Sequence, residues 1–179
     1  MTITYATDSS DSMMWLLLVK VVDLLREIDF NAREPRRDIS DNDIFIMKSV
    51  REKRHLKDLA QLPKPCIIVT PIEINTPLNA GNTSDDDSIH RIAVFILDKD
   101  YDTRHGGLRT WTKWQYQISR KLRWYQFARD IEITNESYVS QVRLRSIETL
   151  EDVSWDTKDT FKSGVMIDVL ARESRHVEP

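Results

Sequence analysis

Residues 89–97 read IHRIAVFIL, and this stretch decides the fold. From position 92 onward apolar side chains stand at even and odd positions alike, so both faces of a strand there would be apolar. Residues 66–70 read CIIVT and have the same character, with Pro71 directly after them. Such runs are typical of strands buried on both faces. We therefore predict two strands buried on both faces, the first of which stops at Pro71 or lies at a sheet edge beyond Thr70.

Two helices are predicted, one before and one after these two strands in the sequence. Over residues 13–28, apolar side chains recur every three or four positions behind a capping residue, Asp11 or Ser12. Over residues 108–127 a second stripe has the same spacing. Each helix would bury one face and needs a surface to cover. The second stripe consists of Trp111, Trp114, Ile118, Leu122 and Tyr125.

Further strands are expected at residues 44–47, 138–150 and 161–172. The element order is then helix, three strands, helix and two strands, which is not a repeating βαβ unit. We predict an α+β fold: a mostly antiparallel β-sheet with the N-terminal amphipathic helix and the second helix packed on it.

The chain has 179 residues, which we interpret as a single domain, 1–179. Within it we expect a mobile N-terminal arm at 1–12, a globular core at 13–172 and a C-terminal tail at 173–179. The polar residues 75–88 are expected to form a loop. No apolar run is long enough to span a bilayer, so no membrane partner is predicted.

Composition argues against several enzyme classes. The four glycines leave no Walker loop or dinucleotide-binding fingerprint. Cys66 is the sole cysteine and is expected to act as a small hydrophobe within its strand. The acidic run 98–102 lacks the glycine and the final glutamate of a calcium loop, and the acidic triplet 85–87 has no second ligand set. We predict no enzyme, no catalytic or metal-ligating residue and no cofactor.

Charge is distributed unevenly along the chain. The formal net charge is −3, yet residues 103–129 hold seven cations and no acidic residue. A solvated helix face usually mixes signs, so a run of one sign indicates an anionic partner. The acidic segments of the same chain, 82–102 and 148–159, fit that description, and patches of opposite sign on one subunit suit head-to-tail contacts that close into rings. The candidate interface residues are Arg104, Arg109, Lys113, Arg120, Lys121, Arg123 and Arg129 on the basic side, and Glu148, Glu151, Asp152, Asp156 and Asp159 on the acidic side.

This order of elements resembles the tail-completion, or tail-terminator, proteins of long-tailed bacteriophages, which stand at the head-tail neck. The likeness lies in the helix 13–28, the strands 66–70 and 89–97, the helix 111–125 and the strand pair 138–150 and 161–172. The charge-dense segment 30–62 is longer than such small proteins usually need.

The resemblance implies a structural virion protein without catalytic residues. Members of that family form a homohexameric ring that ends the tail tube and joins the tail to the head-neck connector. The implied partners are other copies of the chain, neck and connector proteins, tail-tube or sheath proteins, and genomic DNA that passes through the lumen without sequence-specific binding. The implied location is the tail or neck of the virion, which is assembled in the host cytoplasm.

Two alternatives remain open. The basic segment 104–129 would suit a nucleic-acid-binding module with Trp111, Trp114, Trp124 and Tyr125 as stacking groups, although most of these fit the core stripe better. A metal-dependent nuclease would use Asp98 and Lys99 at a strand end, but no second acid and lysine follow at useful spacing.

Overall fold

The computed structural model describes a subset of the 179 residues, and every structural statement below concerns that subset. The described residues are 4–6, 11–30, 38–47, 62, 65–75, 85–99, 107–123, 132–134, 137–152 and 160–174.

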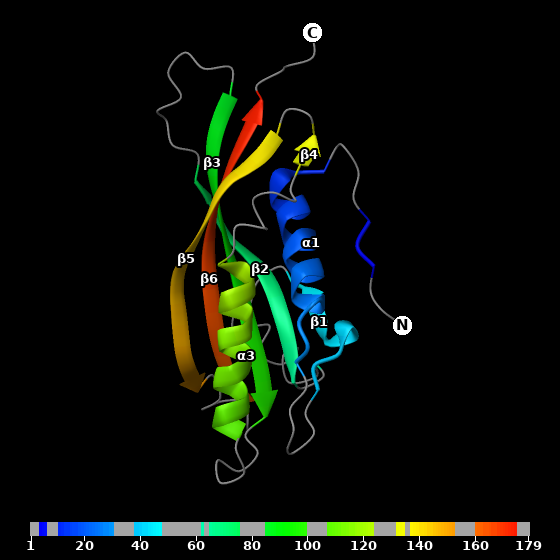
Figure 1. Cartoon of the computed structure of the whole chain (residues 1–179), viewed down its shortest axis with the longest axis vertical. Helices are drawn as coiled ribbons and strands as arrows, with labels where there is room; N and C mark the ends of the chain where they lie inside the picture. Colours follow the sequence, from blue (N-terminus) through cyan, green and yellow to red (C-terminus); the bar gives the residue numbers. More distant parts are fainter. Residues whose placement is uncertain are drawn as a thin grey trace.

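The described residues form one sheet and two α-helices (Figure 1). The helices are α1 (Met13–Arg26) and α3 (Gly107–Leu122), and a short 3-10 turn, η1, covers Asp41–Asp43. The strands are β1 (Ile44–Ile46), β2 (Cys66–Asn75), β3 (Asp85–Lys99), β4 (Glu132–Thr134), β5 (Ser137–Asp152) and β6 (Thr160–Ser174).

The sheet is six-stranded with the order β1-β2-β3-β6-β5-β4. The β1–β2 pair is parallel, and the other four pairs are antiparallel. Both helices lie on the same face of the sheet, where they contact each other, and Figure 1 shows them in front of the strands. The predicted α+β class, with its mostly antiparallel sheet and its two packed helices, is confirmed.

Strand β3 lies between β2 and β6 and is buried on both faces, as residues 89–97 predict. On the helix face, Ile92, Val94 and Ile96 belong to the large core that includes α1 and α3. On the opposite face, Phe95 and Leu97 pack in a smaller apolar cluster with Cys66 and Ile68 of β2. Cys66 is fully buried there and acts as a small apolar side chain, as expected.

Strand β3 is longer than its apolar run and overturns part of the loop expected at residues 75–88. It begins at Asp85, so the acidic triplet 85–87 lies in a strand and not in a polar loop. Its residues 85–87 pair with 172–174 of β6, and this backbone pairing overrides the low strand propensity of aspartate. At the other end the strand continues through Asp98, which is only 3% exposed, to Lys99.

Strand β2 continues past Pro71 to Asn75, with an irregular register between Pro71 and Glu73. Strand β1 pairs with only residues 67–69 of β2, so Pro71 lies where no described strand needs its missing N–H group. The expectation of an edge beyond Thr70 is confirmed.

Helix α1 begins one residue after Ser12, whose hydroxyl accepts a 3.3 Å hydrogen bond from the Trp15 backbone N–H. Of the two capping candidates, the structure selects Ser12. The buried side of α1 includes Leu17, Val21 and Leu25, which are 0% exposed. The helix ends at Arg26, two residues before the expected end.

We expect Ser12→Ala to lower the free energy of unfolding by about 1 kcal/mol, because one of the four unpaired N–H groups of the helix terminus loses its acceptor. Ser12→Asp is the control, since a carboxylate at the cap accepts the same bond. Urea denaturation of both variants measures the difference. Equal losses in the two variants would contradict a capping role for Ser12.

Part of the predicted arm is anchored. The Tyr5 hydroxyl accepts a 2.8 Å hydrogen bond from the Ile46 backbone N–H, and the Trp15 indole donates to the Ala6 carbonyl at 3.2 Å. The rings of Tyr5 and Trp15 meet edge to face, 5.8 Å apart. Residues 1–3 and 7–10 of the arm lie outside the described residues, as do the tail beyond 174 and most of the segment 30–62.

Candidate interaction surface

The outer side of α3 is a surface rich in exposed cations. Its buried side consists of Trp111, Trp114, Ile118 and Leu122, each at most 5% exposed. At about 100° per residue the opposite direction is occupied by positions 109, 113, 116, 120 and 123. All five of these residues are exposed, and we call them the α3 outer stripe: Arg109, Lys113, Tyr116, Arg120 and Arg123.

The rotation of α3 about its axis is fixed by hydrogen bonds to the chain that follows α1. The Trp114 indole donates to the Phe30 carbonyl at 2.8 Å, and the Gln117 amide donates to the Asp29 carbonyl at 2.9 Å. On the same flank the Lys121 ammonium lies 2.5 Å from the Glu27 carboxylate. Near the start of the helix the Trp111 indole donates to the Ser163 hydroxyl of β6 at 2.8 Å. These contacts hold the outer stripe on the side of α3 that faces away from the sheet.

Tyr116 stands in the middle of the stripe and is 62% exposed. Ile74 is the other large hydrophobic residue of the described chain with such exposure. Tyr116 is not among the interface residues predicted from the sequence, because its position does not fall on the apolar core stripe of the helix. The signal was nonetheless present: 109, 113, 116, 120 and 123 are spaced by four, three, four and three, and four of the five are cations.

The structure divides the predicted basic residues into three groups. Arg109, Lys113, Arg120 and Arg123 share the stripe, and within the described chain Arg109, Arg120 and Arg123 form no ion pair. Lys121 lies off the stripe in its ion pair with Glu27. Arg104 and Arg129 lie outside the described residues.

The predicted acidic partners are described less fully. Glu148, Glu151 and Asp152 are residues of β5, and Glu148 and Glu151 pair through the backbone with Gly164 and Lys162 of β6. Asp156 and Asp159 lie outside the described residues. The contact between basic and acidic segments of neighbouring copies stays a prediction.

Two of the aromatic residues predicted to stack on bases in the nucleic-acid alternative are buried. Trp111 and Trp114 are 5% and 1% exposed, and both indole N–H groups are used inside the protein, so neither ring can stack on a base. Trp124 and Tyr125 lie outside the described residues.

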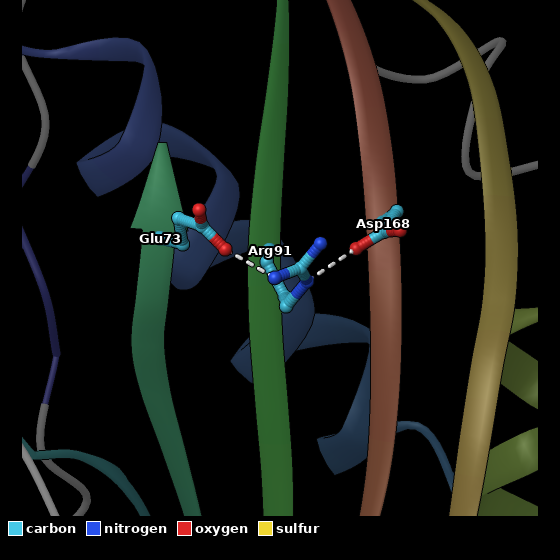
Figure 2. Close-up of polar contacts among 3 residues, drawn as sticks. All are labelled: Glu73, Arg91 and Asp168. Atoms are coloured by element: carbon cyan, nitrogen blue, oxygen red, sulfur yellow. Dashed lines mark hydrogen bonds and ion pairs between the residues drawn. The ribbon is translucent and has the colours of Figure 1, made fainter. Parts of the chain in front are cut away.

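A second charged group lies on the face of the sheet opposite α1 and α3 (Figure 2). Arg91 of β3 reaches toward β2 and β6 at once: its guanidinium contacts the Glu73 carboxylate, and its Nε donates to Asp168 Oδ1 at 2.9 Å. The register irregularity after Pro71 makes this possible, because Ile72 and Glu73 together oppose Arg91. The three side chains neutralise much of one another's charge and join three adjacent strands.

The nuclease alternative finds no support in the described residues. Asp98 is 3% exposed, which leaves its carboxylate no open path to a phosphate. Within the described ranges, no three His, Cys, Asp or Glu side chains come together where they could hold a metal ion. The described helices also include none with the length and apolarity needed to cross a membrane.

Comparisons with known proteins find similarity among solved structures. No family model matches the sequence, and no curated protein matches it significantly. Among solved structures, the chain is similar to a protein of the virion of a native gene transfer agent (GTA) particle, at 8% sequence identity and a TM-score of 0.45. The alignment covers 91% of this chain and 87% of that one.

Proposed function

We propose that the chain is a structural protein of a tailed-phage virion, which forms a ring that ends the tail tube and joins the tail to the head-neck connector. The proposal includes no catalytic step. Its partners are further copies of the chain, six to a ring, together with neck and tail-tube or sheath proteins. Genomic DNA passes through the lumen, and the ring assembles in the host cytoplasm.

The observation that carries the proposal is the pair of unlike, partly open edges of the sheet. On one side β1 covers only residues 67–69 of β2, so residues 70–75 have no described outer partner. On the other side β4 pairs only with Ser137 and Tyr138, which leaves residues 139–152 of β5 without one. Open edges offer unpaired N–H and C=O groups to another strand.

Edges that differ from each other favour head-to-tail contacts. Such contacts repeat from copy to copy and close into a ring when the rotation allows it. Only β4 and β1, of three residues each, shield the two sides of the described sheet. This geometry suits a subunit whose work is self-association, as the tail-completion resemblance implies.

The direct test is electron microscopy of the purified protein, alone and with isolated phage tail tubes. We expect rings with a central opening, or rings that appear when a tube end is present as a template. Light scattering gives the mass of the assembly. A protein that stays monomeric and ignores tube ends would contradict the proposal.

A variant of the β2 edge sharpens this test. Ile74 lies within the open stretch of β2 and is 55% exposed. We expect Ile74→Lys to block ring formation. The melting temperature of the variant should stay within about 2 °C of the wild type, because the substituted side chain is on the surface. Lysine at an edge strand opposes pairing with another strand. Ile74→Val is the matched control and should assemble normally. Normal rings in the lysine variant would show that this edge is not a ring contact.

A further inference from the structure

We infer that the α3 outer stripe, formed by Arg109, Lys113, Tyr116, Arg120 and Arg123, is a binding surface for the phosphodiester backbone of nucleic acid and recognises no base sequence. This assignment stands on the described side chains of α3 and does not require the ring.

The linear arrangement of the cations along α3 favours nucleic acid. At 1.5 Å per residue the stripe extends about 21 Å along one line, with a cation at both ends. Between Gly107 and Arg123 the sequence has no acidic residue that would break this line. A linear array of one sign matches a linear polyanion, and duplex DNA carries one negative charge per about 1.7 Å of its axis.

The residues at the centre of the stripe also favour nucleic acid. The centre of a protein–protein interface is depleted of charge as a whole and more apolar than its rim, although Arg and Tyr are enriched in such interfaces. The α3 outer stripe instead has cations on both sides of its middle residue, Tyr116. An exposed tyrosine among arginines suits nucleic acid, because its ring stacks on an unpaired base and its hydroxyl donates to a phosphate oxygen.

The alternative partner for the stripe is the acidic segment of a second copy of the chain. Trp111 near the start of α3 is hydrogen-bonded to Ser163, whose neighbours Lys162 and Gly164 pair with Glu151 and Glu148 of β5. The acidic end of β5 therefore lies close to the start of α3 in the same subunit. A head-to-tail contact between basic and acidic patches needs them on different sides of one subunit. This arrangement favours nucleic acid as the partner.

The same geometry ranks the cations. Arg109 stands two residues from Trp111, at the end of α3 that lies near the acidic strand end. Arg120 and Arg123 lie three turns or more further along the helix, about 16 to 21 Å from Arg109. We expect Arg120 and Arg123 to contribute more to phosphate binding than Arg109.

Fluorescence anisotropy of the full chain tests the assignment with a labelled duplex of about 20 base pairs and with one of its strands alone. With about four phosphate contacts, the affinity for the duplex should fall about a hundredfold between about 50 and 200 mM salt. Arg120→Glu and Arg123→Glu should each lower the affinity at least tenfold and reduce the salt slope by about one. Arg109→Glu should cost less.

Lys20→Glu is the matched control, because it makes the same change of charge on α1, away from the stripe. It should alter the affinity less than twofold. The Tyr116→Ala variant separates the two nucleic acids: we expect a clear loss of affinity for the single strand, where a base can stack, and little change for the duplex.

Three results would overturn the assignment. The first is a loss in Lys20→Glu that equals the loss in Arg120→Glu, which would show a response to net charge alone. The second is the absence of duplex binding at about 50 mM salt. The third is Arg120→Glu protein that binds DNA normally but no longer assembles, which would make the stripe a contact between copies. Wild-type protein that binds DNA but forms no ring would instead overturn the proposed function and leave this inference intact.

Discussion

Trp114→Ala is expected to lower the free energy of unfolding by about 3–5 kcal/mol, the range for removing a large aromatic side chain from a protein core. Trp114 is 1% exposed and packs in the core cluster that joins α1, α3 and the helix face of the sheet. Its removal leaves a cavity that the surrounding strands can close only in part.

The indole N–H adds a second effect to the cavity. It donates to the Phe30 carbonyl at 2.8 Å in a buried position, so the alanine variant leaves that carbonyl without its partner. Such a group costs about 1–3 kcal/mol when it is cut off from water. Because Phe30 follows α1 closely, the bond also sets how α3 lies against the first helix.

Trp114→Phe helps to separate the two effects, since phenylalanine keeps much of the apolar volume and lacks the N–H donor. We expect about half of the alanine effect in that variant. Tyr116→Ala is the surface control two residues away, and its cost should stay within about 0.5 kcal/mol. Urea denaturation followed by circular dichroism gives all three values. A mild effect of Trp114→Ala, equal to that of Tyr116→Ala, would contradict the buried position of Trp114.

The parts of the fold that sequence predicts well are those that one element determines by itself. Residues 92–97 place apolar side chains on both faces of any strand they form, so the burial of β3 follows from the pattern alone. The stripe from Trp111 to Leu122 likewise selects the buried side of α3 before any partner is known. By elimination this pattern also contains the outer stripe, including the overlooked Tyr116.

The parts that sequence missed depend on a partner far along the chain. Strand β4 has three residues and exists through its pairing with β5. Asp85 is a strand residue because Ser174 lies opposite, and Lys121 leaves the stripe because Glu27 is 2.5 Å away. None of these pairings has a local signal, since register across a sheet and ion pairs between helices are set by tertiary packing.

The ion pairs of Arg91 provide the second large prediction: we expect Arg91→Met to lower the free energy of unfolding by about 2 kcal/mol. Methionine keeps much of the side-chain volume and removes the charge that lies between Glu73 and Asp168 (Figure 2). The two carboxylates would then face each other across β3 without a cation, and removal of one partner of a partly buried ion pair is costly.

The two ion pairs should not contribute equally. The side chains of Arg91 and Asp168 are 19% and 22% exposed, whereas that of Glu73 is 49% exposed. Solvent screens the pair with Glu73 more strongly, and exposed pairs contribute about 0–1 kcal/mol. We therefore expect a coupling energy of about 1–2 kcal/mol for Arg91 with Asp168, and less than about half of that for Arg91 with Glu73.

Double-mutant cycles with Arg91→Met, Asp168→Asn and Glu73→Gln measure these two couplings directly. Because the cycle subtracts what each single substitution does elsewhere, any other contact of Asp168 drops out of the result. High salt should weaken the coupling to Glu73 first, since that pair is the more exposed. Equal couplings with equal salt dependence would mean that the two carboxylates hold Arg91 in the same way. The irregular register after Pro71 places Glu73 opposite Arg91. The ion pair that it allows would then join β2 to β3 as strongly as the ion pair of Arg91 with Asp168 joins β3 to β6.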